Sequence, residues 1–174
     1  AMDPVGPLDP VALTRALVDI DSTTGKEGEA ARWLAQYLRG RGYTVDEQPV
    51  TDGRFNVYAH LGVPPLVVFS THIDCVPPFF PSREERGLVF GRGACDAKGI
   101  IAAQVAAAEQ VRAAGESRIG LLFVVGEERG SDGARVANAH TPAGVRYLIN
   151  CEPTDNRLGA ATRSEEHTSE LQSH

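Results

Sequence analysis

The chain has 174 residues, of which 42% are hydrophobic and 6% aromatic, so it is long enough for one domain with a hydrophobic core. Its formal net charge of -6 and the absence of a lysine and arginine cluster argue against nucleic acid as a partner. No stretch has the length of a membrane span, and no signal peptide is visible at the N-terminus. Three cysteines without a CxxC pair favour a reducing compartment, so we expect a cytoplasmic protein.

The first part of the chain predicts two helices and a β-hairpin. Asp9 is suited to cap a helix that has Pro10 in its first turn, and a polar break at 22–26 separates this helix from a second, amphipathic one. Asp52-Gly53 is a typical hairpin turn between two alternating segments. We expect the helices at 10–20 and 27–41 and the strands at 43–50 and 54–61.

The second part alternates short apolar runs with helical segments. Buried strands are expected at 66–69, 119–125 and 145–150, a loop at 84–86 with a short strand at 87–90, and helices at 98–114 and 132–138. Strands that alternate with helices predict an α/β fold with a mainly parallel or mixed sheet flanked by helices. No linker divides this part of the chain into two domains.

Polar side chains follow each of the three apolar strands. His72 and Asp74 come after the first, Glu127 and Glu128 after the second, and Glu152 after the third. Because ligands bind at the carboxyl ends of strands in open α/β sheets, we expect these side chains to converge there. A lone histidine after a strand is more often structural, and a pair of glutamates is usually a solvated loop, so the combination carries the interpretation.

Carboxylates together with an imidazole are the usual ligands of a hydrolytic zinc, manganese or cobalt site. In extended backbone His72 and Asp74 point to the same side, so Asp74 could accept the second imidazole N–H and orient the ring. Asp96, just before the alanine-rich helix, has two oxygens that could bridge two metals about 3.5–4 Å apart. Of the adjacent Glu127 and Glu128, one could bind metal while the other acts as a general base.

Four motifs in this order resemble the M20 metallopeptidase and amidohydrolase family, which includes acetylornithine deacetylase and succinyl-diaminopimelate desuccinylase. The motifs are THIDCVP (71–77), GRGACDAKG (91–99), EE (127–128) and CEPT (151–154), and the resemblance covers residues 8–162. It implies a zinc-peptidase-like catalytic domain. It also implies that Glu127 is the general base and that Asp74 is the orienting carboxylate. Arg92, Lys98 and Pro153 match motif positions too, and we interpret them as structural. The implied metal ligands are His72 and Glu152 for the first metal, Glu128 for the second, and Asp96 as the bridge.

The resemblance further implies two divalent metal ions, with zinc preferred over cobalt or manganese. The implied reaction is hydrolysis of an amide bond of a small-molecule N-acyl amino acid, because the motifs around Asp96 and Glu152 look closest to the acetylornithine deacetylase branch. A dipeptidase or aminopeptidase acting on short peptides is the alternative within the family. A non-catalytic metal-binding or regulatory fragment is the alternative outside the enzymes.

Family members also have a lid domain that mediates dimerisation and a last histidine ligand, and neither follows here. Instead, residues 163–173 match the translation of a common sequencing adapter, so we expect 163–174 to be a non-native tail and 1–162 a partial catalytic domain. His167 and His174 lie in this tail and are not candidates for the missing ligand. We therefore expect the chain as written to be a poor catalyst, and the intact protein to form a homodimer.

Other site types fit the sequence less well. The glycines at 91 and 93 form neither a dinucleotide fingerprint nor a P-loop, and no Gly-x-Ser-x-Gly elbow is present. Cys95 and Cys151 flank proposed ligands and could supply a thiolate, but we expect them to be small buried packing residues.

Overall fold

The fold is known from a computed structural model that describes residues 7–140, 142–155, 157 and 159. Helix α1 (Pro10–Val18) begins as predicted, because the Asp9 carboxylate accepts hydrogen bonds from the backbone of Val11 and Ala12 at 2.9 and 3.1 Å. Helix α2 (Gly28–Gly40) presents one apolar face, as its spacing predicts. The residues between α1 and α2 form a polar connection that contacts the candidate site.

The main sheet has five strands in the spatial order β1-β2-β6-β3-β7. Strands β1 and β2 form the predicted hairpin, β2 pairs antiparallel with β6, and β3 pairs in parallel with both β6 and β7. The predicted mixed α/β fold is therefore confirmed. The strands are β1 (Thr44–Thr51), β2 (Arg54–His60), β3 (Val67–His72), β6 (Ile119–Val124) and β7 (Tyr147–Asn150).

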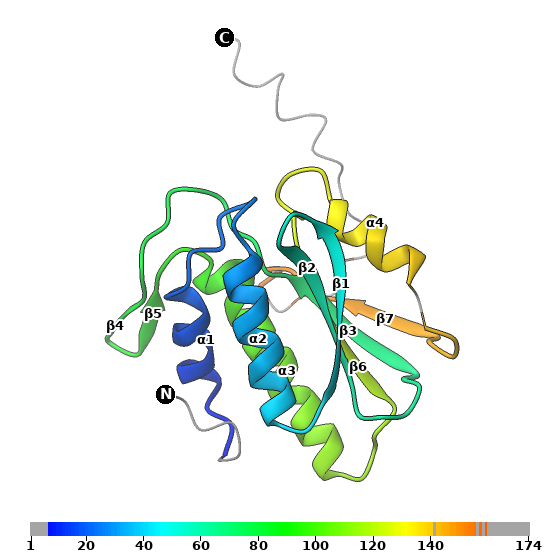
Figure 1. The fold of residues 1–174 in the computed structure, drawn as a ribbon. Helices are drawn as coiled ribbons and strands as arrows, with labels where there is room; N and C mark the ends of the chain where they lie inside the picture. Colours follow the sequence, from blue (N-terminus) through cyan, green and yellow to red (C-terminus); the bar gives the residue numbers. More distant parts are fainter. Residues whose placement is uncertain (1–6, 141, 156, 158, 160–174) are drawn as a thin grey trace.

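Helices cover both faces of the sheet (Figure 1). Helices α1, α2 and α3 (Gly99–Ala113) lie on one side, and the short α4 (Asp132–Ala139) packs against β1, β2 and β6 on the other. The main core lies between the sheet and the three helices, where each fully buried leucine or phenylalanine stabilises the fold by about 1.5–3 kcal/mol. Its largest side chains include Leu13, Leu17, Leu34, Leu38, Ile101, Leu121 and Phe123.

Two expectations about strands were wrong. Residues 84–86 were expected to be a loop, but β4 (Arg83–Glu85) pairs antiparallel with β5 (Leu88–Phe90), and only Arg86 with φ 53° and Gly87 make the turn. Strand β7 was expected to be buried, but all four of its residues are exposed. It is the last strand of the sheet, and none of the described residues lies beyond it.

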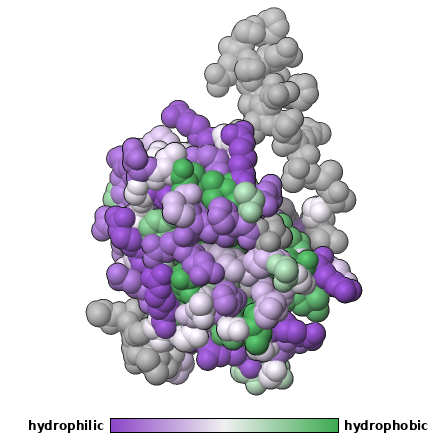
Figure 2. All heavy atoms as spheres, turned by 45° about the vertical axis from the view of Figure 1, so that its right-hand side comes forward, coloured by the Kyte–Doolittle hydropathy of each residue, from purple (hydrophilic) through white to green (hydrophobic). Residues whose placement is uncertain are grey.

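The exposed edge leaves apolar surface in contact with solvent. Tyr147 and Leu148 are each 61% exposed and Ile149 is 48% exposed. Figure 2, in which the β7 side of the molecule comes forward, shows hydrophobic side chains at the surface among polar ones. An open strand edge of this kind is a site for pairing with another strand.

The topology brings the predicted site residues to one end of the sheet. Strands β3, β6 and β7 are parallel, so their carboxyl ends lie on the same edge. The irregular turn η1 (Ala94–Lys98) leads into α3 and carries Asp96. Across the residues that the structure describes, no helix is long and apolar enough to cross a membrane.

Candidate metal centre

His72 ends β3 and is buried, with 1% of its surface exposed. Its Nδ1 lies 3.0 Å from the backbone carbonyl oxygen of Asp74, which can only accept, so Nδ1 carries a hydrogen and Nε2 is the nitrogen available to a metal. Burial lowers the pKa of His72, but the carboxylates of Asp74, Asp96 and Glu152 outweigh this effect and raise the pKa to about 12. The histidine therefore sits in a strongly anionic environment.

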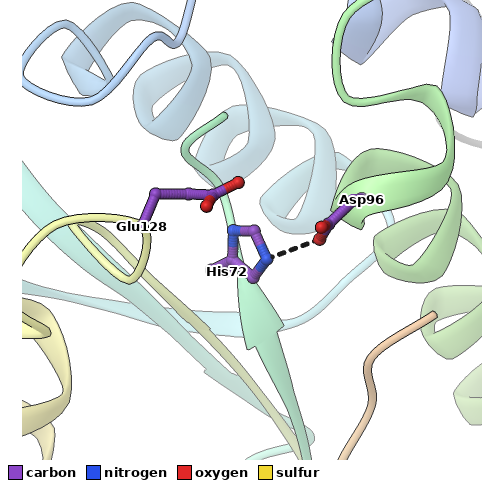
Figure 3. Close-up of side chains that lie close together, drawn as sticks. All are labelled: His72, Asp96 and Glu128. Carbon is purple, nitrogen blue, oxygen red and sulfur yellow. Dashed lines mark hydrogen bonds and ion pairs between the residues drawn. The ribbon is translucent and has the colours of Figure 1, made fainter. Parts of the chain in front are cut away.

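Three of the four predicted ligands form one compact group. Ligand atoms of His72, Asp96 and Glu128 all lie within 4.8 Å of one another, and Figure 3 shows the three side chains pointing toward one another from separate segments. His72 Nε2 lies 2.9 Å from Asp96 Oδ1. The fourth, Glu152, lies beside the group, with Oε2 3.7 Å from His72 Nε2. One imidazole and several carboxylates suit a divalent cation of the zinc or manganese type.

The turn that presents Asp96 depends on the glycines before it. Gly93 has φ +81°, and a Cβ at Gly91 would lie 2.3 Å from the side chain of Val18. Neither position accommodates a side chain without a shift of its surroundings. Lys98, at the end of this turn, is fully buried and donates a 2.8 Å hydrogen bond from Nζ to the carbonyl of Ile20. This contact agrees with a structural role for Lys98.

The Asp74 carboxylate contacts both the strand that carries His72 and the loop that carries the two glutamates. Its Oδ1 lies 3.5 Å from His72 Nδ1, and its two oxygens also accept hydrogen bonds from the backbone N–H groups of Glu127 and Glu128, at 3.0 and 3.1 Å. Thr24 donates a further 3.0 Å bond. Burial would raise the pKa of Asp74, but hydrogen bonds from His72 and from the Glu127 backbone lower it. The ionised carboxylate therefore connects β3 to the loop that carries both glutamates.

A second buried carboxylate supports the same loop and was missed by the sequence analysis. Glu27 is fully buried; Oε1 accepts from the backbone of Gly126 at 3.1 Å and Oε2 from Gly25 at 2.9 Å. Arg54 donates to both of its oxygens, at 2.7 and 2.8 Å, and also to Asp132 at 2.9 Å. Nothing in the sequence pairs residues 27 and 54; the only signal was an acidic residue at the start of a helix.

The two glutamates differ in their surroundings. Glu128 is half-buried and belongs to the metal group, whereas Glu127 is exposed next to it. Desolvation comes first among the causes that raise the pKa of both carboxyls. The negative charge of Glu152 adds to the effect for Glu127, and that of Asp96 for Glu128. A carboxylate with a raised pKa at an exposed position is suited to accept and return a proton.

The cysteines are not placed as expected. Cys95 is exposed and Cys151 is half-buried. The structure therefore contradicts the expectation that they are buried packing residues. Neither belongs to the group of metal-ligating atoms found among the described residues.

Comparison with known proteins shows the family to which this chain belongs. Residues 68–165 match peptidase family M20/M25/M40, and this chain belongs to that family. A probable carboxypeptidase of Aspergillus fumigatus is 39% identical over 176 residues, which cover 84% of this chain and 40% of that protein. The chain thus spans about two fifths of the length of this curated relative.

Solved structures share the fold. A tripeptidase from Staphylococcus aureus superposes with a TM-score of 0.67 at 22% identity, covering 84% of this chain and 44% of the tripeptidase. A Bacillus subtilis protein described as a dinuclear metal binding peptidase from the M20 family superposes with a TM-score of 0.57 at 15% identity, covering 81% and 41% of the two chains. At these identities the likeness supports the fold of this chain alone.

Proposed function

We propose that this chain is part of a metal-dependent hydrolase that cleaves an amide bond of an N-acyl amino acid, as acetylornithine deacetylase does. The observation that carries the proposal is the convergence of His72, Asp96 and Glu128 at the carboxyl edge of the sheet. Family membership supports the hydrolase class. The curated relative is much longer than this chain, so the proposed activity is that of a whole protein of which this chain is a part.

The site residues would have three roles: metal ligand, general base and orienting carboxylate. His72 and Glu152 would hold one divalent ion, Glu128 a second, and Asp96 both, with zinc preferred over cobalt or manganese. Such a pair of ions lowers the pKa of a water molecule and polarises the scissile carbonyl. Glu127 would accept the proton of the attacking water at a carboxylate oxygen and return it to the leaving nitrogen. Asp74 would hold the His72 ring and the loop of Glu127 in register.

A second candidate is peptide hydrolysis. The fungal relative is described as a probable carboxypeptidase, which favours a peptide as substrate. The two candidates share the bond that is cleaved and differ in what precedes it, an acyl group or an amino acid residue. In both cases the substrate is a small molecule. We further propose that the whole protein forms a homodimer.

Zinc binding by the chain is the first test. Isothermal titration of the wild type should show saturable binding of Zn²⁺ that His72→Ala or Asp96→Asn removes, with the folded circular dichroism spectrum unchanged. Equal binding by wild type and His72→Ala would refute the metal centre. In the whole protein, turnover of N-acetylornithine compared with that of a dipeptide and a tripeptide would then separate the two candidates.

We also propose that residues 163–174 are not native, in keeping with the adapter match. They lie outside the described residues, and nothing in the structure bears on them. The test is to sequence the source gene across the codon for Arg163 from genomic DNA. A reading frame that continues past that codon into a different sequence supports the proposal, whereas the same twelve codons followed by a stop refute it.

A further inference from the structure

The loop that carries the two site glutamates is closed at its base by its own backbone. This glutamate loop (residues 126–131) follows β6 and leads into α4, which packs against β1 and β2 (Figure 1). Ser131 N–H donates to the carbonyl of Gly126 at 2.8 Å, and Gly133 N–H donates to the carbonyl of Val125 at 3.1 Å. The incoming and outgoing ends of the loop therefore lie side by side.

Asn56 on β2 bonds to both ends of the glutamate loop with a single amide. Its Oδ1 accepts from the Val125 N–H at 3.1 Å, and its Nδ2 donates to the Gly133 carbonyl at 2.8 Å. The Asn56 side chain is fully buried, and a Cβ at Gly133 would lie 2.5 Å from its Oδ1. Because a carboxamide offers an acceptor and a donor side by side, Asn56 can bridge two backbone segments as a neighbouring strand would.

Arg54, two residues earlier on β2, holds the same two ends through carboxylates. At the outgoing end, its Nη1 donates to Asp132 Oδ2 at 2.9 Å. At the incoming end, it pairs with Glu27, which accepts from the Gly126 N–H at 3.1 Å. One strand thus joins the two ends of the glutamate loop twice, directly through Asn56 and by two ion pairs through Arg54.

The middle of the glutamate loop is fixed as well. The backbone N–H groups of Glu127 and Glu128 donate to the Asp74 carboxylate at 3.0 and 3.1 Å. Breaking a buried hydrogen bond leaves a polar group unsatisfied, which is costly, so a short loop held at its ends and its middle has little freedom. Tight metal binding requires a ligand that is held close to its bound position, and Glu128 belongs to the metal group.

We infer that Asn56 is a positioning residue: by joining the two ends of the glutamate loop, it fixes Glu128 at the metal group. It acts at a distance, because the hydrogen bonds of its side chain go to Val125, Gly133 and Gln48. The inference rests on the proposed function, since the position of the loop matters for metal binding only where Glu128 is a ligand.

The nearly isosteric variant Asn56→Asp tests this inference. It keeps the acceptor for Val125 but loses the donor and places an oxygen against the Gly133 carbonyl. In the metal-free chain, hydrogen exchange at the amides of Val125 and Ser131 should become at least about tenfold faster relative to that of β3.

The same variant should also weaken the metal centre. We expect the affinity for Zn²⁺ to fall by about 10–100-fold, and the visible absorption spectrum of the Co²⁺-loaded chain to change. The added negative charge would by itself favour a cation, so a loss of affinity reports the displaced loop. Asn56→Ser, which shortens the side chain without adding charge, carries the same expectations and replaces Asn56→Asp if that variant does not fold by circular dichroism.

Tyr43→Phe is the matched control, because it is also nearly isosteric and removes a hydrogen bond of a buried side chain. Tyr43 Oη donates to Glu109 Oε1 at 2.8 Å. Tyr43 directly precedes β1, at the end of the β1–β2 hairpin remote from Arg54. This variant should lose stability but keep the wild-type exchange pattern of the glutamate loop, the affinity for Zn²⁺ and the Co²⁺ spectrum.

The possible outcomes separate this inference from the proposed function. If the Asn56 variants keep the wild-type affinity for Zn²⁺ and the Co²⁺ spectrum, or if Tyr43→Phe loses as much affinity as they do, the positioning role is overturned. Unchanged exchange in the glutamate loop overturns it as well. If the wild type binds no Zn²⁺, or His72→Ala binds it equally, the proposed function fails, and the exchange of the metal-free chain still decides whether Asn56 holds the loop.

Discussion

Arg54 and Glu27 form a bidentate ion pair beneath the loop that carries the two site glutamates. Arg54 Nε and Nη2 lie 2.7 and 2.8 Å from the two oxygens of Glu27, and the Glu27 side chain is fully buried. Glu27 also accepts from the Gly126 backbone, directly before Glu127. This ion pair between residues far apart in sequence therefore supports the backbone directly before Glu127, the proposed general base.

Removing one member of this pair should destabilise the fold strongly. Arg54→Ala leaves the Glu27 carboxylate buried without its cation, and breaking a buried pair in this way costs about 3–5 kcal/mol. Urea denaturation should show the loss as a lower transition midpoint. Lys26→Ala is the control, because the Lys26–Asp21 pair is a solvent-exposed one, and it should change stability little. Equal effects of the two substitutions would contradict the importance of the buried pair.

Glu128→Gln should weaken metal binding, whereas Glu127→Gln should leave it nearly unchanged. Glu128 belongs to the compact metal group, so its neutral variant should lower the affinity for Zn²⁺ by tenfold or more. Glu127→Gln should leave that affinity within about twofold and, in the whole protein, remove most turnover by about 10²–10⁴-fold. Calorimetric titration of the two variants decides; loss of zinc in Glu127→Gln would mean that the two roles are exchanged.

Asp74→Asn should weaken the metal centre without removing a ligand. The neutral amide cannot accept from both the Glu127 and Glu128 backbone N–H groups, because one of its two terminal atoms is a donor. Loss of a partner that orients a ligand typically costs 10–100-fold, so we expect zinc affinity to fall by about that factor. Thr24→Val removes one hydrogen bond to the same carboxylate and should have a smaller effect. An unchanged affinity in Asp74→Asn would show that Asp74 does not support the site.

Glu109 should make stability depend on acid pH. Burial would raise the pKa of Glu109, but hydrogen bonds from Arg41, at 2.8 Å, and from Tyr43 outweigh it and lower the pKa. A carboxyl group whose pKa is lower in the folded state stabilises the fold above the unfolded pKa, about 4.3, and loses that contribution as pH falls through the folded pKa. Glu109→Gln should therefore be less stable than wild type at pH 7, by about 1–3 kcal/mol.

The same difference in unfolding free energy should shrink as the pH of urea denaturation is lowered from 5 towards 2. A gap between wild type and Glu109→Gln that stays constant over this range would show that the group contributes no pH-dependent stability.

The β7 edge should drive self-association. Leu148 is 61% exposed on an open strand, and a lysine at an edge position discourages pairing with a second chain. Leu148→Lys should therefore lower the apparent mass measured by light scattering at high protein concentration. Lys substitution at Val63, which is exposed in a loop, should not. Identical concentration dependence in wild type and Leu148→Lys would rule out this edge as the cause.

The sequence by itself predicted the elements and the chemistry of the site. Period-2 and helical spacing located the strands of the main sheet and helices α1 to α4 to within a few residues, but missed β4. The order His72, Asp96, Glu127, Glu128 and Glu152 indicated a hydrolytic metal site. The predictions of strands and helices succeed because apolar periodicity is a local property of a segment. The roles assigned to the individual ligands stay predictions.

Only the tertiary structure decided how distant groups pair. Strand order placed β7 at an exposed edge although its apolar run is typical of a buried strand, because burial depends on what packs beyond the strand. Chain folding also joined Glu27 to Arg54. Charge pairing between segments far apart in sequence has no local signal, and so it appears only when the segments meet.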